Sequence, residues 1–455
     1  MNEIAVETPE NAFLPGGRRR HRKPRRSGTG TGLQRALVLA MAVPVASAAL
    51  AGPNAFAADK GVGATAKSDL PDPDDQQIAA NLETRVQDTR LGSNVSGVVI
   101  DADSDTTIWG HNASTALMPA SNAKLATSAA ALTVLGPDHR FTTKVVYGDG
   151  TLTLVGGGDR TLTTADLTDL AKAAVAGLKA AGLTTVKVAV DDSLFPEPTL
   201  ADGWNNGYYP DTVAPVRALV VDKHAVQDTS IDAGQAFAKQ LAAGGVTVTG
   251  DVTRSTAGAQ DVPVARHKSA PLSDIVKSML KRSDNNIAES LLRMTALGAG
   301  RPATFEGGTE VLRQVLSGVY GVSLDNFELH DGSGLSRKDR IPAATLAQIL
   351  DLLTQPRYAH TLGSMLEGLP VSGETGSTLG SEYGRFDGEN SKCAVGKVHA
   401  KTGTLTGAIA LSGLTQGKDG KWKVFSFIEN GATADQNSIK DAMDDLAATV
   451  NGCYA

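Results

Sequence analysis

Alternating apolar and polar residues predict β-strands in two distant parts of the chain. Residues 95–100 and 107–109 alternate on either side of a polar turn at 102–105, which is typical of a β-hairpin. The same alternation predicts three further strands near the C-terminus, at residues 395–400, 408–414 and 422–428. Because helical patterns fill much of the sequence between them, we expect the two parts to form an antiparallel sheet flanked by helices, which is an α+β domain.

Apolar residues spaced three and four positions apart predict the helices. One helix follows Met118-Pro119-Ala120 and ends before Gly136. Pro271 begins another, and a further helix follows Ser283. The same spacing predicts the remaining helices of this domain at residues 76–89, 343–353, 361–369 and 437–450.

Between residues 142 and 264 the pattern changes to short strands that alternate with helices. Strands are predicted at residues 144–147, 152–155, 186–190 and 246–252, and helices at 164–181 and 233–243. Such alternation is typical of an α/β unit. We therefore predict a discontinuous domain, residues 79–141 and 265–455, interrupted by an inserted α/β domain, residues 142–264.

The first 57 residues have the composition of an export signal. A basic region precedes an apolar stretch at 36–51, and Ala55-Phe56-Ala57 follows as a cleavage site of the A-x-A kind. This apolar stretch is shorter than the roughly 20 residues that a spanning helix needs. We predict a signal peptide at 1–57, a polar linker at 58–78 and an exported protein. An uncleaved N-terminal anchor, or peripheral association with the membrane, remains the alternative.

Charge and composition exclude several classes of function. The whole chain has a formal net charge of −6, and residues 1–57 contribute +5, so the remainder carries −11. Nucleic-acid binding needs a basic face, and nucleic acid is therefore not an expected partner. The sequence contains no H-E-x-x-H motif and no phosphate loop ending in Gly-Lys-Ser/Thr, so neither a metal nor another cofactor is predicted.

The chain contains two cysteines, Cys393 and Cys453. In an exported protein these two residues are candidates for a disulfide, which would close a loop of about 60 residues. Two free thiols are the alternative.

Three short motifs carry the predicted chemistry: Ser121-Asn122-Ala123-Lys124, Ser283-Asp284-Asn285 and Lys401-Thr402-Gly403. A serine and a lysine three positions apart lie on one face of a helix, so the amine can reach the hydroxyl. A helix N-terminus also offers unpaired N–H groups to a developing oxyanion. A second S-x-x-K, Ser278 to Lys281, lies inside a predicted helix without a preceding loop, and we interpret it as incidental.

A site with two lysines has a physical rationale. Lys124 must be at least partly neutral to accept a proton, and both burial and a neighbouring cation lower the pKa of a lysine. Lys401, if it lies beside Lys124, is that cation. The small Gly403 lets a substrate backbone approach closely.

S-x-x-K, S-D-N and K-T-G in this order are the signature of penicillin-binding proteins and class A β-lactamases. The chain resembles the low-molecular-mass penicillin-binding proteins that carry an insertion between the first two motifs, which are D-alanyl-D-alanine carboxypeptidases and endopeptidases. The resemblance implies a β-lactamase-like fold, and it covers most of the chain from about residue 79. It is carried by residues 118–124, 156–159, 283–289, 331–337, 369–373 and 400–407.

This resemblance implies a serine D-Ala-D-Ala carboxypeptidase that acts on peptidoglycan peptides and is acylated by β-lactams. Ser121 would attack the penultimate D-alanine carbonyl, Lys124 would take its proton, and Ser283 would pass a proton to the departing nitrogen. Asn285 would hold the donor amide, and the terminal carboxylate would bind to Lys401, Thr402 and Thr404. The backbone N–H groups of Ser121 and Thr404 would form the oxyanion hole. Arg337 would approach the pocket.

The sequence departs from this family in the insertion. In relatives a Trp-containing segment supplies an acid to the side-chain pocket. Trp204, Tyr208 and Tyr209 match that segment, but Gly207 stands where a carboxylate is expected, and Asp211 is the nearest acid downstream. Recognition of a diamino-acid side chain therefore stays open.

Two other functions are alternatives. A β-lactamase needs fast deacylation, and no glutamate-bearing loop of the class A kind lies between Ser283 and Lys401. A non-catalytic sensor of β-lactams or cell wall is the other alternative, and the three intact motifs argue against it.

Overall fold

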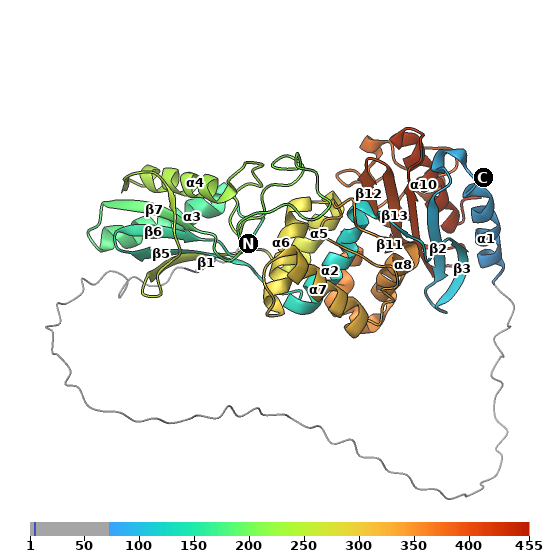
Figure 1. The fold of residues 1–455 in the computed structure, drawn as a ribbon, viewed down its shortest axis with the longest axis horizontal. Helices are drawn as coiled ribbons and strands as arrows, with labels where there is room; N and C mark the ends of the chain where they lie inside the picture. The colour runs from blue at the N-terminus through green and yellow to red at the C-terminus, as the bar shows by residue number, and fades with distance from the viewer. Residues whose placement is uncertain (1–3, 6–71, 455) are drawn as a thin grey trace, which may run out of the picture. The chain divides into compact units, whose positions relative to one another are not determined.

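The computed structural model describes residues 4–5 and 72–454 (Figure 1). The predicted signal peptide, apart from β1 (Ile4–Ala5), and most of the predicted linker lie outside the described residues. Within the described residues, no helix is both long and apolar enough to cross a membrane.

The N-terminal and C-terminal parts of residues 72–454 meet in one antiparallel sheet of five strands. Its order is β12-β13-β14-β2-β3, so the N-terminal hairpin pairs directly with the last C-terminal strand. This arrangement confirms the antiparallel sheet predicted from the sequence. The strands are β2 (Val95–Asp101), β3 (Thr106–His111), β12 (His399–Leu405), β13 (Ala408–Gln416) and β14 (Trp422–Asn430).

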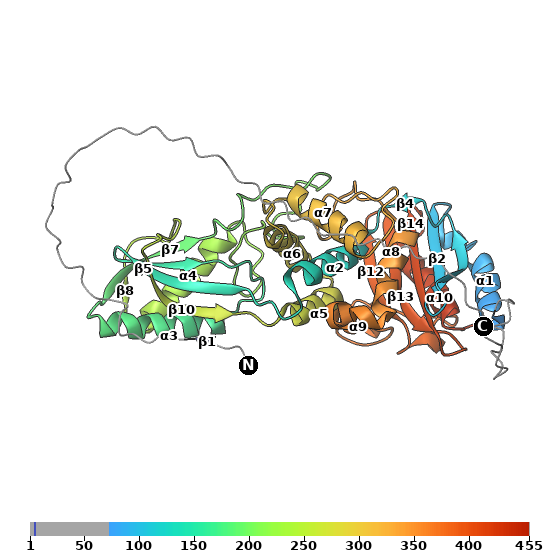
Figure 2. The same cartoon turned by 90° about the horizontal axis from the view of Figure 1, so that it is seen from below.

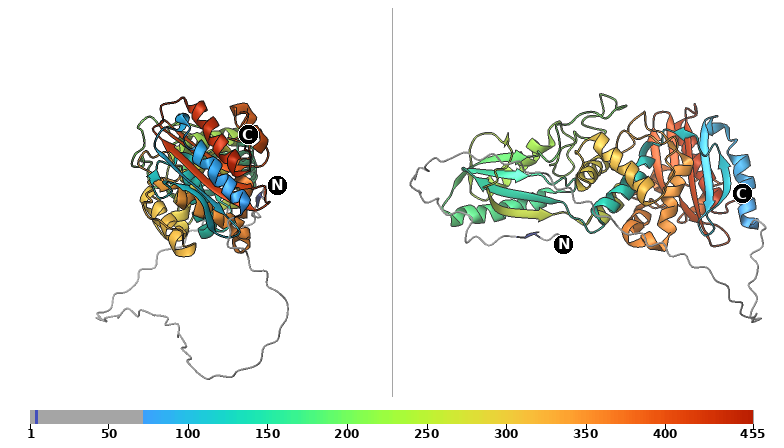
Figure 3. Two further views of the ribbon diagram at one scale, coloured as in Figure 1. Left: turned by 90° about the vertical axis from the view of Figure 1, so that its right-hand side faces the viewer. Right: turned by 60° about the horizontal axis from the view of Figure 1, so that its bottom comes forward.

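Alternate side chains of this sheet pack against different helices. Val98 and Val424 belong to a cluster with α2 and α8, whereas Val99 and Phe425 belong to a cluster with α1 and α10. Figure 3 shows α1 and α10 side by side over the sheet. The sheet is therefore a layer with helices on both faces. The helices named here are α1 (Pro73–Arg85), α2 (Ala123–Leu135), α8 (Ala343–Asp351) and α10 (Gln436–Val450).

Helix α2 is the centre of the helical layer. Its residues from Ala123 to Leu132 are all buried, because small and apolar side chains cover its whole circumference. The helix ends at Gly136, whose φ of +87° lies in the region that favours glycine. The other helices of this layer are α5 (Leu272–Arg282), α6 (Asn285–Gly298), α7 (Phe305–Gln314) and α9 (Ala359–Gly368).

Residues 142–268 form a second, mixed sheet with its own hydrophobic cluster (Figure 2). β5 pairs antiparallel with β6 and β10, while β7 runs parallel to β6. Helices α3 and α4 contact each other and contribute to the same cluster. The elements are β5 (Thr142–Gly148), β6 (Thr151–Val155), α3 (Thr164–Ala180), β7 (Thr185–Asp191), α4 (Thr229–Ala243), β8 (Thr247–Val248), β9 (Thr253–Arg254) and β10 (Val262–Lys268).

Three predicted element bounds are wrong for local reasons. Helix α1 begins at Pro73, because Asp72 accepts a hydrogen bond from the Asp74 N–H and proline suits the first helical position. The strand predicted at 395–400 begins only at His399, where pairing with β13 begins. The strand predicted at 246–252 is interrupted by Gly250, whose φ is +74°.

Helix α7 and strand β10 were not predicted from the sequence, and neither were the shortest elements. Those elements are β4 (Ala116–Leu117) paired with β11 (Ile341–Pro342), a π-helical turn at Val315–Val319, and 3-10 turns at Thr89–Leu91, Ala120–Asn122, Leu352–Thr354, Pro356–Tyr358, Ser381–Tyr383 and Lys392–Ala394.

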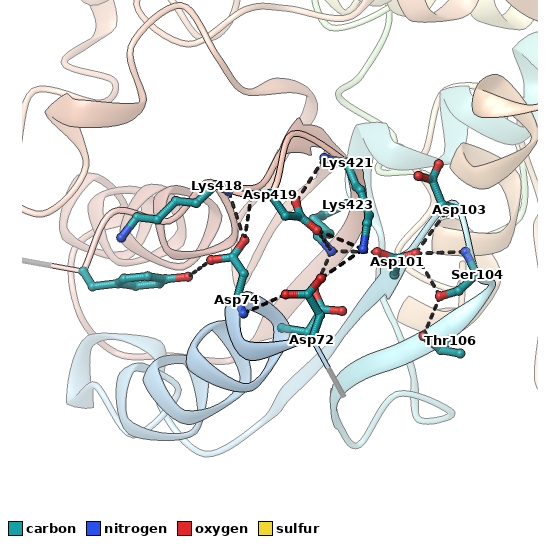
Figure 4. Close-up of polar contacts among 12 residues, drawn as sticks. Asp72, Asp74, Asp101, Asp103, Ser104, Thr106, Lys418, Asp419, Lys421 and Lys423 are labelled. Carbon is teal, nitrogen blue, oxygen red and sulfur yellow. Dashed lines mark hydrogen bonds and ion pairs between the residues drawn. The ribbon is translucent and has the colours of Figure 1, made fainter. Parts of the chain in front are cut away.

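A buried ammonium joins α1 to two turns of the sheet (Figure 4). Lys423 Nζ lies 2.5 Å from Asp75, 2.6 Å from Asp101 and 3.0 Å from Asp419. Among the described residues, these three carboxylates are the group that lies close enough together to hold a cation, and the Lys423 ammonium lies among them. Their charges outweigh the effect of burial, so the pKa of Lys423 is raised.

Candidate active site

Ser121 lies in the tight turn that leads into α2. The preceding residue, Ala120, has a φ of +46°, an uncommon conformation for a residue with a side chain. The turn is held from outside by Gly334, where an added Cβ would lie 1.9 Å from the Ala120 carbonyl oxygen. The neighbouring loop therefore needs glycine at this position, and the two segments fix the direction of the Ser121 side chain.

Lys124 is fully buried one helical turn after Ser121. Its Nζ lies 2.9 Å from Ser121 Oγ, 2.8 Å from Asn285 Oδ1 and 2.7 Å from the Ser333 carbonyl oxygen. A neutral amine has two hydrogens and one lone pair. The amide and carbonyl oxygens can only accept, so they take the two hydrogens, and the lone pair faces the Ser121 hydroxyl. The contacts thus suit a neutral lysine that accepts a proton from serine.

The pKa of Lys124 agrees with this arrangement. Burial lowers it to about 8, against the opposing charges of Asp331, Glu289 and Asp284. At pH 7 roughly a tenth of the amine is therefore neutral, far more than for an ordinary lysine, which suits a general base.

Two buried acids hold the loop that faces Lys124. Glu289 accepts hydrogen bonds from the N–H groups of Gly332 and Ser333, and burial together with Asp331 raises its pKa to about 8. Asp331 accepts from the Gly334 N–H at 2.7 Å and from the Trp204 indole N–H at 2.6 Å. These bonds position the Ser333 carbonyl oxygen that accepts from Lys124. Both acids lie in stretches that carried the family resemblance, but the sequence assigned no role to them.

Ser283 and Lys401 form a second hydroxyl–amine pair. Ser283 ends α5 in the left-handed conformation, with φ 58° and ψ 39°, and its Oγ lies 2.9 Å from Lys401 Nζ. Lys401 is fully buried, and its Nζ also donates to the Thr402 carbonyl oxygen at 2.7 Å. Burial and the nearby Lys124 ammonium hold the pKa of Lys401 well below its usual value. The structure therefore brings the two lysines into electrostatic contact.

Asn122 joins the first motif to the third. In the orientation that satisfies its neighbours, its amide nitrogen donates to the Lys401 carbonyl oxygen at 3.1 Å and its oxygen accepts from the Gly403 N–H at 3.2 Å. Strand β12 lies so close to this turn that a Cβ on Gly403 would lie 2.7 Å from the Pro119 carbonyl oxygen. Gly403 thus lets the strand approach the turn that holds Ser121.

The segment between β7 and α4 holds the Ser283-Asp284-Asn285 motif and the residue after it. Lys223 Nζ pairs with Asp284 at 2.8 Å, and Asn285 Nδ2 donates to the Thr212 carbonyl oxygen at 3.0 Å. The next residue, Asn286, accepts hydrogen bonds from the Ala214 N–H at 2.7 Å and from Arg160 at 3.0 Å. The 142–268 region therefore contacts the motif through three consecutive residues.

The three motifs open onto a cleft of about 380 Å³. Its lining residues include Ser121, Ser283, Asn285, Thr402 and Thr404. Lys124 and Lys401 lie behind this surface. The residues that complete the lining were not predicted from the sequence: Thr212, Leu335, Thr378, Leu405, Tyr383, Arg385 and Lys440. Most come from loops, and only the spatial arrangement identifies them.

Arg337 is exposed and lies beyond this lining. Its Nη1 donates to the Thr406 carbonyl oxygen at 3.0 Å, one residue after Leu405, which does line the cleft. Trp204 is buried and bonded to Asp331 instead of facing a ligand, while Asp211 is exposed. Cys393 and Cys453 are joined by a disulfide, with their Cα atoms 6.2 Å apart.

Comparison with known proteins agrees with this geometry. The sequence profile described as the D-Ala-D-Ala carboxypeptidase 3 (S13) family matches residues 78–225 and 223–450. The chain is 32% identical to Carboxypeptidase DacB of Mycolicibacterium smegmatis over 412 residues, 84% of this chain and 85% of the relative. It is 30% identical to the D-alanyl-D-alanine carboxypeptidase of Actinomadura sp. strain R39 over 503 residues, 90% of this chain and 89% of that protein.

A solved structure shares the fold. The crystal structure of penicillin binding protein 4 from Haemophilus influenzae matches 82% of this chain and 98% of its own, with a TM-score of 0.70 and 25% identity. The same protein has also been solved in complex with a β-lactam.

Proposed function

Because the chain belongs to the D-Ala-D-Ala carboxypeptidase 3 (S13) family and is a serine-type D-Ala-D-Ala carboxypeptidase, we propose that Ser121, Lys124 and Ser283 carry out the reaction. The observation that carries this proposal is the contact set of Lys124 Nζ. Two of its neighbours can only accept hydrogen bonds, and the third is the Ser121 hydroxyl.

Acylation begins when Ser121 Oγ attacks the carbonyl carbon of the penultimate D-alanine and Lys124 takes the hydroxyl proton. The N–H groups of Ser121 and Thr404 stabilise the oxyanion, a contribution often worth about 3–4 kcal/mol. Asn285 holds the donor amide with the Nδ2 hydrogen that is not bonded to Thr212.

The leaving amine receives its proton through Ser283. Ser283 Oγ lies 2.9 Å from the Lys401 amine, so Lys401 can return to Ser283 the proton that the hydroxyl gives away. The carbon–nitrogen bond breaks and D-alanine departs with the proton from Ser283. A water molecule then attacks the ester: its hydroxyl stays on the acyl carbon, its proton returns to Ser121 Oγ, and the proton that Lys124 took from Ser121 passes back to Lys401.

Substrate binding and proton transfer are coupled through the two lysines. The terminal carboxylate of the peptide binds to the hydroxyls of Thr402 and Thr404, which line the cleft in front of the buried Lys401 ammonium. A bound carboxylate favours the charged form of Lys401. The Lys401 ammonium in turn disfavours a charge on Lys124, so the substrate itself promotes the neutral base.

The substrates proposed for this chain are peptidoglycan peptides that end in D-Ala-D-Ala, and β-lactams acylate the same serine. D-Ala-D-Ala peptides and β-lactams bind members of this family. We also propose that the protein is exported and cleaved after residue 57. An exported protein lies in an oxidising compartment, in which the Cys393–Cys453 disulfide persists.

We further propose that residues 142–264 are an inserted domain. Its closing strand, β10, continues to Lys268.

Release of D-alanine from an N-acylated tripeptide that ends in D-Ala-D-Ala tests this function. We expect release by the unsubstituted chain and none by Ser121→Ala, together with a stable penicilloyl adduct on Ser121 detected by mass spectrometry. Rapid turnover of penicillin would instead show a β-lactamase, and penicillin binding without peptide hydrolysis would show a sensor.

A further inference from the structure

A second pocket, of about 410 Å³, lies where strand β12 begins and has no part in the proposed reaction. None of its described lining residues also lines the catalytic cleft. Thr402, the nearest residue of β12 that does line the cleft, lies three positions after His399, about 10 Å along the strand. The pocket is formed by the approach to β12, the β13–β14 turn and the end of α10. Its lining residues are Gly396, Lys397, His399, Gln416, Gly417, Lys418, Trp422 and Asn451.

Trp422 gives this pocket an aromatic wall. Of the three tryptophans in the chain, Trp109 and Trp204 are only 6% and 8% exposed, whereas Trp422 is only partly buried. The His399 ring lies beside Trp422, with the ring centroids 6.2 Å apart and the planes at 76°, so the two rings form a corner. Burial lowers the pKa of His399, and its neutral ring can both donate and accept a hydrogen bond at neutral pH.

The other side chains of the pocket offer polar groups that have no partner. Within residues 72–454, the Lys397 amine and the Gln416 amide make no hydrogen bond or ion pair. Lys418 Nζ lies 4.0 Å from the centroid of the Tyr454 ring, a contact that holds the amine in place but does not neutralise its charge. None of the lining residues is acidic. The pocket therefore carries two uncompensated positive charges.

This combination of groups selects a class of ligand. The face of an aromatic ring is negative and attracts the weakly positive C–H groups on the face of a sugar ring. Two ammonium groups favour a carboxylate or a phosphate, because hydrogen bonds between charged groups are the strong ones. The volume also lies within the range of about 300–1,000 Å³ that is usual for small-molecule sites.

We propose that this pocket binds an anionic sugar, with the sugar ring against Trp422 and its carboxylate or phosphate held by Lys397 and Lys418. The inference goes beyond the proposed function, because it requires neither hydrolysis nor any group of the catalytic cleft. Binding at this pocket and reaction at Ser121 are therefore measured separately.

Isothermal titration calorimetry of the full chain tests the proposal with three probes. N-acetylglucosamine is neutral, its 6-phosphate carries a phosphate, and N-acetylmuramic acid carries a carboxylate. We expect at least one charged sugar to bind more tightly than the neutral one, and the tighter of the two identifies the preferred anion. Lys397→Met and Lys418→Met should each weaken the charged sugar about tenfold and change N-acetylglucosamine less than about twofold.

Tryptophan fluorescence locates the bound sugar. Because Trp109 and Trp204 are buried, the charged sugar should change the emission of the unsubstituted chain but not that of Trp422→Phe. Lys392→Met is the matched control, since Lys392 is exposed in the turn that precedes the pocket and does not line it. This control should leave the affinity for all three sugars unchanged.

Several results would overturn the proposal. These are equal affinity for the three sugars, no binding of any of them, or unchanged affinity in both lysine variants. Inorganic phosphate that binds as tightly as the sugar phosphate would show an anion site without sugar recognition. Loss of sugar binding once penicillin occupies Ser121 would place the sugar in the catalytic cleft instead. Release of D-alanine by the same preparation reports on the proposed function independently.

Discussion

At the residue scale, the candidate site depends on backbone positions that a side chain cannot easily occupy. Ala120 at φ +46° and Ser283 at φ 58° hold uncommon conformations, each of which costs about 1–3 kcal/mol. Ala120 precedes Ser121 and is held by the close approach of Gly334, whereas Ser283, the C-cap of α5, itself carries the second hydroxyl of the proposed mechanism. The strained backbone thus lies at the positions that set the directions of the Ser121 and Ser283 hydroxyls.

The rate of acylation should follow the titration of Lys124. Its pKa is lowered to about 8, and the neutral amine, which accepts the proton, increases as pH rises through that value. The second-order acylation rate by penicillin should therefore rise about tenfold between about pH 7 and pH 9. Stopped-flow measurement across this range checks it. A flat profile would contradict the assignment of Lys124 as base.

Asn122→Ala should weaken both stability and substrate binding. The substitution leaves the buried Lys401 carbonyl and Gly403 N–H without their partner, at about 1–3 kcal/mol for each unsatisfied group. Thermal unfolding should show a lower Tm, and KM for the D-Ala-D-Ala peptide should rise because strand β12 shifts. Ser412→Ala removes only a third partner of the same amide and should have the smaller effect.

At the scale of elements, the segment between β7 and α4 acts as a support for the second motif. It supplies Lys223 to Asp284, the Thr212 carbonyl to Asn285 and the Ala214 N–H to Asn286. No local hydrophobic pattern indicates this role, since the segment has no helix or strand of its own. The inserted region therefore contributes to the position of Ser283 without supplying a reacting group.

Lys223→Met tests this support. The substitution removes the ion-pair partner of Asp284, the residue next to Ser283. It should lower kcat for D-alanine release about threefold to tenfold, because Ser283 is then held less firmly in its reactive position. KM should change little, because Lys223 does not line the cleft. Lys239→Met, on the exposed face of α4 in the same region, is the control and should leave kcat unchanged. An unchanged kcat would show that the other two contacts suffice.

The ion pairs of Lys423 attach α1 to the sheet, and a substitution can test their contribution to stability. Lys423→Met would leave three carboxylates close together without their shared cation. Breaking a buried pair by removing one partner costs about 3–5 kcal/mol. Chemical denaturation should show a loss of this size, and Asp419→Asn, which removes only the longest of the three contacts, should cost less.

At the scale of the whole molecule, the N-terminal and C-terminal parts of residues 72–454 close the same sheet. Helix α1, the β2–β3 hairpin, the three C-terminal strands and α10 form one layer structure, although more than 280 residues separate β3 from β12. The Cys393–Cys453 disulfide joins the last residues to the loop before β12.

Reduction of this disulfide should destabilise the protein without changing the chemistry. A closed loop with a sequence separation of 60 residues corresponds to about 4 kcal/mol in the chain-entropy estimate. Paired Cys393→Ser and Cys453→Ser substitutions should lower the free energy of unfolding by up to this amount, with the penicillin acylation rate preserved. A loss of acylation in the folded variant would show that the bond also shapes the cleft.

The sequence by itself determined most of the helices and strands, the antiparallel sheet and the three motifs. Strands β2, β13 and β14 and helices α2, α3 and α10 follow from hydrophobic spacing and from residues such as Gly136, because these signals act over a few neighbouring positions. The contact between Ser121 and Lys124 also follows from local spacing, because the two residues lie one helical turn apart.

The tertiary structure alone decided which distant groups face one another. Lys401 approaches Ser283 across 118 positions, and Glu289, Asp331 and Lys440 gain their positions from packing that leaves no local trace. The physical reason is the distance along the chain over which each effect acts. Backbone propensity and side-chain spacing are short-range effects, whereas burial, and with it the lowered pKa of both lysines, exists only once the whole core has formed.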